Sequence, residues 1–164
     1  MKVTGMVIRQ ANKADIDVLV TLLRRSFRDV AKRFGITEEN NPGSLAFCTN
    51  ERVESDLEKD LTYYVLEKDG WPCGCVALER AKPGVCYLMR LAVLPGHRGK
   101  GYGKMLVHHI LEKAHTTGAR RVEIAMISKD RKLKNWYKKL SFIQKSTKKF
   151  EHLPFTVAFM YREI

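Results

Sequence analysis

Hydrophobic residues recur along this chain with two different periods. Between Ile16 and Phe34 they return at steps of three and four, which predicts an amphipathic helix. Asn12 and Asp15 supply an N-cap pair for its start, and Gly35 supplies its stop. Similar stripes and one acidic run predict three further helices, at about residues 51–60, 106–114 and 133–140.

Short apolar runs rich in β-branched and aromatic residues predict strands between these helices. They span residues 6–11, 62–68, 73–81, 85–94, 122–127, 141–150 and 156–164. The turns DG and KPG join the second, third and fourth runs so closely that they predict an antiparallel meander. We therefore predict one α/β domain of the α+β type over residues 1–164, with a mixed, mostly antiparallel sheet of about six or seven strands and about four helices.

Composition and cysteine content predict a cytoplasmic protein with no membrane partner. No apolar run approaches the roughly 20 residues that span a bilayer, and the opening MKVTGMVIRQ lacks the apolar stretch of a signal peptide. Cys73 and Cys75 lie two apart in a predicted strand, so both side chains should point to one face. Neither they nor Cys48 and Cys86 show the paired spacing of a zinc site, so we expect reduced structural thiols and no metal.

The net charge of +12 is unevenly distributed along the chain. Residues 98–149 contain fifteen Lys and Arg against three Asp and Glu, which accounts for the whole excess. Residues 35–60 contain seven acidic residues against two basic ones. One part of the molecule is therefore suited to an anion, and the other is suited to a cation.

The segment HRGKGYGKML, residues 97–106, places three glycines directly before a predicted helix. A helix N-terminus offers unpaired N–H groups, and glycines let the backbone approach a ligand closely, so the segment predicts a cradle for a phosphate or pyrophosphate. Arg98, Lys100 and Lys104 add positive charge. The spacing fits neither a P-loop nor the dinucleotide fingerprint, and it leaves R-x-x-G-x-G at Arg98, Gly101 and Gly103.

The longer segment LMRLAVLPGHRGKGYGKMLVHHIL, residues 88–111, resembles the acetyl-CoA-binding core of the GNAT superfamily of N-acetyltransferases. The segment NWYKKLSF, residues 135–142, resembles that family's LYxKxGF helix end, and the order of elements also agrees over most of the chain. The resemblance implies an acetyl-CoA-dependent acyltransferase that moves an acetyl group, not an aminoacyl group, directly to a primary amine in a ternary complex. It also implies a splayed strand pair that holds acetyl-CoA as cosubstrate.

The resemblance assigns cofactor contacts to two segments. Backbone groups of Leu91, Ala92 and Val93 would pair with the pantetheine arm, beside a bulge, and an N–H at Leu91 or Ala92 would stabilise the developing oxyanion. The N–H groups of the glycine turn would hold the pyrophosphate. That turn comprises Arg98, Gly99, Lys100, Gly101, Tyr102, Gly103 and Lys104.

Tyr137 occupies the place where the family's tyrosine protonates the leaving thiolate. It also lies on the apolar stripe of its helix, where tyrosine is often simply a core residue. Two positions depart from the family pattern. Ser141 replaces the LYxKxGF glycine, so the turn there is expected to differ, and Asp130 stands where the family often has Asn, with an N-cap as its first interpretation.

No general base is assigned from the sequence. Many relatives carry a glutamate on the strand that here contains Tyr87, and the neighbouring Glu79 and Glu123 are open alternatives that can equally face solvent. His108 and His109 diverge on one helix, and we expect neither to be catalytic. Water can also accept the proton.

The acidic segment suggests a cationic amine acceptor, such as a polyamine, an aminoglycoside or a lysine side chain. The acids concerned are Glu38, Glu39, Glu51 and Glu54. A solvated acidic helix is the equally weighted alternative, and His152 or Phe155 is a further candidate for acceptor contact.

Two other functions remain open. The basic half could bind nucleic acid, but the aromatic residues of KDRKLKNWYKKL fall on an apolar stripe, so we do not expect a nucleic-acid partner. An inert acyl-CoA sensor on the same fold is the other alternative. The resemblance is also compatible with a homodimer.

Overall fold

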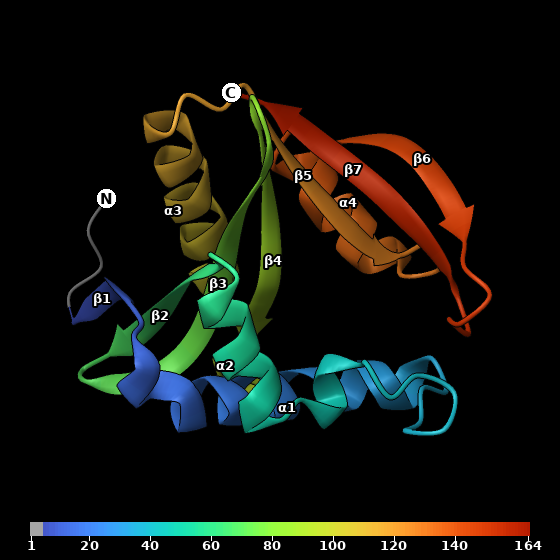
Figure 1. The fold of residues 1–164 in the computed structure, drawn as a ribbon, viewed down its shortest axis with the longest axis horizontal. Helices are drawn as coiled ribbons and strands as arrows, with labels where there is room; N and C mark the ends of the chain where they lie inside the picture. Colours follow the sequence, from blue (N-terminus) through green and yellow to red (C-terminus); the bar gives the residue numbers. More distant parts are fainter. Residues whose placement is uncertain (1–4) are drawn as a thin grey trace.

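The computed structural model describes residues 5–164 and shows one seven-stranded sheet with helices on both faces (Figure 1). The strand order is β1-β2-β3-β4-β5-β7-β6. The strands are β1 (Met6–Gln10), β2 (Thr62–Lys68), β3 (Trp71–Lys82), β4 (Val85–Val93), β5 (Arg121–Ile127), β6 (Ile143–Lys149) and β7 (Thr156–Glu163). The α-helices are α1 (Ile16–Arg33), α2 (Asn50–Glu58), α3 (Tyr102–Thr116) and α4 (Arg131–Lys139). The predicted fold class is confirmed, and the element bounds differ from the predicted ones by a few residues.

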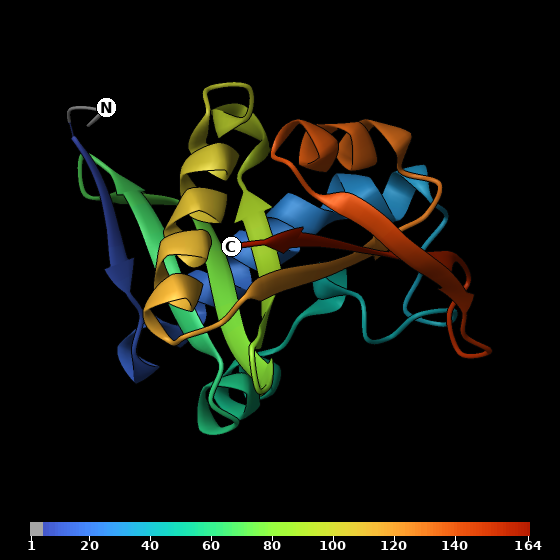
Figure 2. The same cartoon turned by 90° about the horizontal axis from the view of Figure 1, so that it is seen from above.

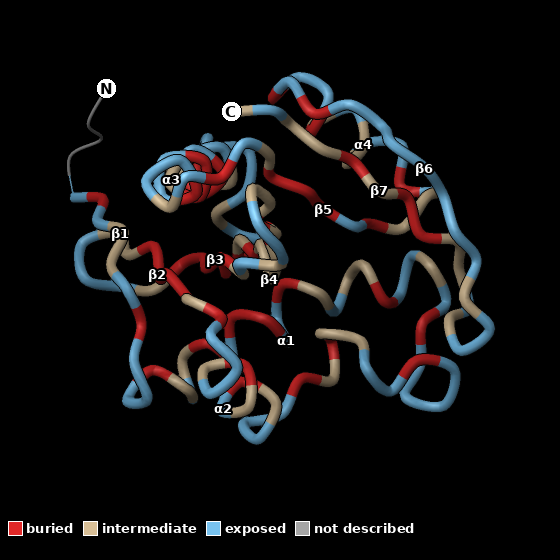
Figure 3. Tube along the Cα trace, turned by 45° about the horizontal axis from the view of Figure 1, so that its top comes forward, coloured by how far each residue is buried: buried red, intermediate tan, exposed pale blue. Residues whose placement is uncertain are grey.

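The helices cover opposite faces of the sheet in pairs. Buried residues of α3 and α4 share one hydrophobic cluster with one face, and buried residues of α1 and α2 share a second cluster with the other (Figure 2). The edge strand β6 is exposed along its whole length (Figure 3) and carries lysines, which disfavour pairing with another sheet. No helix in residues 5–164 is both long enough and apolar enough to cross a bilayer.

Strands β4 and β5 are parallel and separate soon after they begin. They pair only through residues 85–87 of β4 and residues 121–123 of β5, and then diverge (Figure 1). All other neighbouring strands pair antiparallel, as the predicted meander requires. The splayed strand pair that the sequence resemblance implied is therefore present.

Two bulges change which way side chains point. On β3 the register with β2 shifts at Cys73, so Cys73 and Cys75 pack into clusters on opposite faces of the sheet. The prediction that they point the same way was wrong because a bulge inserts one residue into the alternation. On β4, two residues, Arg90 and Leu91, lie opposite the single residue Val76, and Arg90 has a φ of 58°.

Helix α4 ends in the turn that a glycine would make. The N–H groups of Ser141 and Phe142 donate to the carbonyls of Lys138 and Tyr137, which is the Schellman arrangement, and Ser141 has a φ of 68°. The sequence predicted a different turn here because Ser141 replaces glycine. The structure instead keeps the turn and places serine in the left-handed region, which costs about 1–2 kcal/mol for a residue with a Cβ.

Candidate functional site

The glycine turn at the start of α3 presents a row of free backbone donors. Gly99 and Gly101 have φ values of 77° and 85°, which residues with a Cβ rarely adopt. Among the hydrogen bonds of residues 5–164, none uses the N–H group of any residue from 99 to 104. These donors lie at the positive end of the α3 dipole, which is the arrangement that the predicted anion site requires.

Charged side chains contribute to this turn in a different way from the predicted one. The Arg98 guanidinium binds Asp29 at 2.9 Å, the carbonyl of Ser26 at 2.6 Å and the carbonyl of Val93 at 3.0 Å. These contacts of the Arg98 side chain hold the glycine turn against α1 and the end of β4. Lys100 and Lys104 remain exposed beside the free N–H groups.

Gly103 allows α4 to approach the start of α3. A Cβ built on Gly103 would lie 3.1 Å from Cζ2 of Trp136, so the indole ring packs against the glycine itself. The side chain of Tyr102 is buried in the core, while its N–H group stays in the row of free donors. The glycine at this position thus serves packing between two helices as well as access to the turn.

The segment Leu91–Val93 of β4 lies at the separation between β4 and β5. Ala92 and Val93 pair with Cys75 and Gly74 of β3, and the opposite edge of this segment has no strand partner among residues 5–164. The bulge directly precedes it. An unpaired strand edge next to a cradle for phosphate is a suitable surface for an extended ligand with amide groups.

Tyr137 is buried between two aromatic rings. Its ring makes edge contacts with Trp136 and Phe142 at centroid distances of 5.0 and 5.3 Å. Burial raises the pKa of Tyr137, so the phenol stays protonated and can donate a proton or hydrogen bond. No residue from 5 to 164 makes a hydrogen bond with its hydroxyl. Asp130 caps α4 by accepting from the N–H of Leu133 at 3.1 Å, as expected, and its other oxygen lies 3.7 Å from Arg33.

The candidates for a general base lie in one row across the sheet. Tyr87 is the register partner of Glu79 on β3 and of Glu123 on β5. Glu123 does not face solvent, since it is 6 % exposed, and one oxygen lies 3.5 Å from Lys145. Its Oε2 is buried without a hydrogen bond. His108 is exposed on α3.

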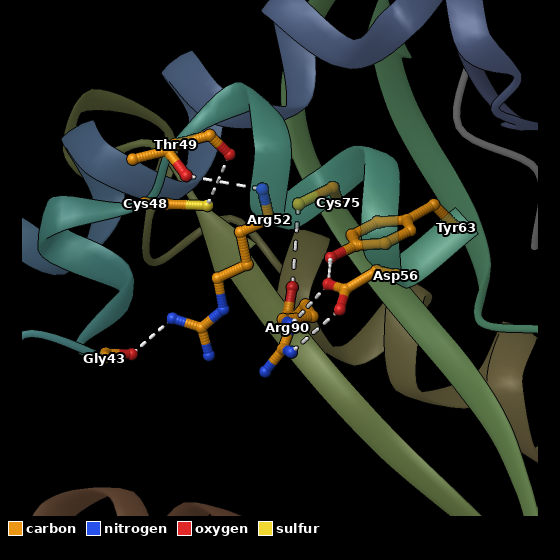
Figure 4. Close-up of polar contacts among 8 residues, drawn as sticks. All are labelled: Gly43, Cys48, Thr49, Arg52, Asp56, Tyr63, Cys75 and Arg90. Atoms are coloured by element: carbon orange, nitrogen blue, oxygen red, sulfur yellow. Dashed lines mark hydrogen bonds and ion pairs between the residues drawn. The ribbon is translucent and has the colours of Figure 1, made fainter. Parts of the chain in front are cut away.

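A buried ion pair beside the β4 bulge escaped the sequence analysis. The Asp56 carboxylate on α2 accepts hydrogen bonds from the Arg90 guanidinium at 3.2 and 3.4 Å and from the Tyr63 hydroxyl at 2.6 Å (Figure 4). The sequence pattern predicts only a charged helix around Asp56 and apolar strands around Tyr63 and Arg90. No spacing signal links them, because Arg90 and Asp56 are 34 positions apart in the chain.

The acidic residues assigned to a cationic acceptor lie on the surface. Glu38, Glu39, Glu51 and Glu54 are all exposed, and none makes an ion pair within residues 5–164. His152 stacks on the edge of Phe150, and Phe155 packs on a small apolar cluster near the end of α1. Residues 5–164 contain no cluster of three or more His, Cys, Asp or Glu side chains that could hold a metal ion.

Comparison with known proteins agrees with this geometry. The sequence profile of the Acetyltransferase (GNAT) family matches residues 23–142. A protein named amino-acid acetyltransferase from Neisseria meningitidis serogroup A is 32 % identical over 116 residues, which is 70 % of this chain and 23 % of that protein. A protein of the same name from Ralstonia nicotianae is 32 % identical over 89 residues, 53 % of this chain and 19 % of that protein. The chain thus spans about a quarter of the length of these curated relatives or less.

Solved structures resemble the fold over almost the whole chain. The PaiA N-acetyltransferase from Thermoplasma acidophilum, solved with coenzyme A, has a TM-score of 0.77 at 20 % identity, covering 98 % of this chain and 100 % of that one. YncA from Salmonella typhimurium, a putative acetyltransferase solved with acetyl-CoA, has a TM-score of 0.72 at 18 % identity, covering 98 % and 94 %. At these identities the likeness concerns the fold alone.

Proposed function

Because the chain belongs to the GNAT family of acetyltransferases, we propose that it transfers an acetyl group from acetyl-CoA directly to a primary amine. The observation that carries the proposal is the row of free N–H groups at residues 99–104, which continues into the unpaired edge of β4. That row fits a pyrophosphate, and the edge fits an arm containing amides. Acetyl-CoA would supply the activated thioester.

The residues of this chain would then act in the following way. Leu91 or Ala92 donates an N–H to the carbonyl oxygen as it gains negative charge, and the fixed sheet holds this donor in place. Tyr137, kept protonated by burial, donates to the sulfur of the departing thiolate. The separated strands β4 and β5 would hold the amine and the thioester in line, and this alignment supplies much of the rate acceleration.

The amine loses its proton to water or to a carboxylate in the row of Tyr87. Glu123 is the buried carboxylate of that row, but Lys145 and Arg121 already neutralise it at 3.5 and 3.6 Å. We therefore propose that water accepts the proton of the amine. We also propose that the reaction takes place in the cytoplasm.

Acetyl-CoA binding, measured by calorimetry at physiological salt, tests this proposal. Gly101→Glu should abolish saturable binding, because a carboxylate would stand among the phosphate donors and a Cβ would strain a φ of 85°. Gly84→Glu is a matched control, since Gly84 has a φ of 80° and open space around it, but lies at the turn between β3 and β4. Equal binding by both variants would contradict the proposal.

Thiol release with a panel of amines then tests the chemistry. Tyr137→Phe should lower kcat by about a hundred- to ten-thousandfold while acetyl-CoA binding persists. Single-stranded RNA serves as the competing ligand. RNA binding that falls steeply with salt, without acetyl-CoA binding, would instead favour a nucleic-acid module. Acetyl-CoA binding without turnover of any amine would favour an inert sensor.

A further inference from the structure

The C-terminal end of α1 lies across the side where β4 and β5 have separated. These strands pair only over their first three residues, and α1 runs below both of them, where they are farthest apart (Figure 1). Leu23 of α1 shares a core cluster with Ala92 of β4. Phe34, which follows α1, belongs to a small apolar cluster with Ile127 of β5 and Phe155 just before β7. The helix therefore contacts both of the separated parts of the sheet.

One ion pair adds a polar contact at this place. Arg33, the last residue of α1, lies 3.7 Å from the carboxylate of Asp130, the residue that caps α4. Within residues 5–164, no other ion pair joins a residue before β5 to a residue of β5 or beyond. Arg33 and Asp130 thus link the two parts of the sheet on the side opposite the short β4–β5 pairing.

The two helix ends favour this pair electrostatically. Arg33 stands at the negative end of the α1 dipole, and Asp130 stands at the positive end of the α4 dipole. The Arg33 guanidinium also lies over the ring of Phe34, 5.2 Å from its centroid, which helps to orient it. Asp130 is 6 % exposed, so its carboxylate would keep only the cap hydrogen bond from Leu133 if Arg33 were lost.

Asp130 in turn fixes where α4 begins. Its N–H group donates to the carbonyl of Ile127 at the end of β5, at 3.0 Å, while its side chain caps the helix. Further along α4, Trp136 packs against the start of α3, and Tyr137 packs against Phe142. Tyr137 lies about two helical turns after Asp130 in a helix of nine residues. A displacement of Asp130 would therefore be passed on to the Tyr137 side chain.

We propose that Arg33 is a positioning residue for the acetyl-transfer step. Through Asp130 it holds the start of α4 against the end of α1, and this keeps Tyr137 in place to donate to the departing thiolate. The inference rests on the proposed acetyl transfer and on the role proposed there for Tyr137. The contact lies outside the row of free N–H groups and the unpaired edge of β4, so it should affect the rate rather than the affinity for acetyl-CoA.

Thiol release with the most active amine of the panel measures kcat, and calorimetry measures the dissociation constant of acetyl-CoA. Arg33→Gln should lower kcat about three- to thirtyfold, because a misplaced donor is a poor one, and should change the dissociation constant by less than about twofold. Arg33→Lys should keep part of kcat, since a positive charge can still reach Asp130. Lys32→Gln is the matched control and should keep kcat, because Lys32 is exposed and has no ion pair within residues 5–164.

A double-mutant cycle tests the pair itself. Asp130→Asn removes the charge and keeps a good N-cap, so it should lower kcat as Arg33→Gln does. The double variant should be no slower than either single variant, because both changes remove the same contact. Additive losses would overturn the inference. So would an unchanged kcat in Arg33→Gln, or a weaker affinity for acetyl-CoA with kcat unchanged.

Amide hydrogen exchange of the protein without ligand separates a failure of this inference from a failure of the proposed function. The Arg33 side chain is half exposed, so Arg33→Gln should fold, and its exchange in residues 131–139 should be about threefold faster or more than in Lys32→Gln. Equal exchange rates would overturn the inference. If acetyl-CoA does not bind, or no amine is acetylated, the proposed function fails, and the exchange rates alone decide whether Arg33 holds α4.

Discussion

Replacing Asp56 by Asn should destabilise the fold more than any exposed substitution. The change keeps the side-chain volume but removes the charge that pairs Arg90 and accepts from Tyr63 at 2.6 Å. Asp56 is 8 % exposed, so water can replace little of the lost ion pair and hydrogen bonding. Removing one partner of a buried ion pair costs about 3–5 kcal/mol. Arg90 keeps some solvent contact and the Asn carbonyl can still accept one hydrogen bond, so we expect a loss of about 2–4 kcal/mol.

Urea unfolding followed by circular dichroism measures this loss as a lower midpoint with an unchanged slope. Asp60→Asn is the matched control, because Asp60 lies in the exposed turn after α2 with a φ of 67°, which Asn also tolerates. It should change the free energy of unfolding by less than about 0.5 kcal/mol. A loss below about 1 kcal/mol in Asp56→Asn would refute the reasoning that the pair is buried and mutually dependent.

The interaction between the two residues can be isolated with Arg90→Gly. Glycine adopts a φ of 58° without strain, so the bulge itself should survive the substitution. Arg90→Gly should therefore cost less in the Asp56→Asn background than in the wild type, because the uncompensated charge disappears. Strictly additive losses would mean that Asp56 stabilises the fold through Tyr63 alone.

Four further changes test other parts of the structure. Ser141→Gly should raise the free energy of unfolding by about 0.5–1 kcal/mol, the relief of left-handed strain minus the added chain entropy of glycine, measured as a higher urea midpoint. Gly103→Ala should lower it by about 1–3 kcal/mol and shift Trp136 fluorescence, because the new Cβ would lie 3.1 Å from the indole. Gly101→Ala should weaken acetyl-CoA binding at a cost of about 1–2 kcal/mol, seen by calorimetry. Burial and, to a smaller extent, Lys113 lower the pKa of His109. The unfolded state therefore takes up a proton first as the pH falls, and the free energy of unfolding should decrease below about pH 6.5. His109→Phe should weaken this pH dependence, measured as urea midpoints between about pH 7.5 and 5.5.

The sequence predicted the parts of this fold that depend on local patterns. Periodic apolar residues located three of the helices, an acidic run located α2, and the glycines before α3 located the row of free N–H groups, since all three signals lie within a few neighbouring positions. The resemblance to a family added the separation of β4 and β5. Ser141 shows the limit of residue type as a guide, because the tertiary contacts of Phe142 keep a turn that serine alone disfavours.

Contacts between distant positions could not be predicted in the same way. The acidic run of α2 gave no sign that Asp56 alone turns inward, because its partner arises from a bulge in β4. A bulge at Cys73 likewise interrupts the alternation of side chains along β3, and the sequence pattern does not reveal it. The motif assigns the Arg98 side chain to the anion, yet its guanidinium pairs with Asp29 of α1, which lies 69 positions away in the chain.

The brief pairing of β4 with β5 has a consequence for the lifetime of the protein. Three residue pairs join the β5–β7–β6 part of the sheet to the rest, so this junction is where local opening should begin. A cosubstrate that hydrogen-bonds to both separated strands would close the junction and stabilise the folded state by mass action. Amide hydrogen exchange in β5, and degradation by proteases that act on the opened chain, should therefore slow as acetyl-CoA rises. The abundance of the enzyme would then follow the supply of its own acetyl donor.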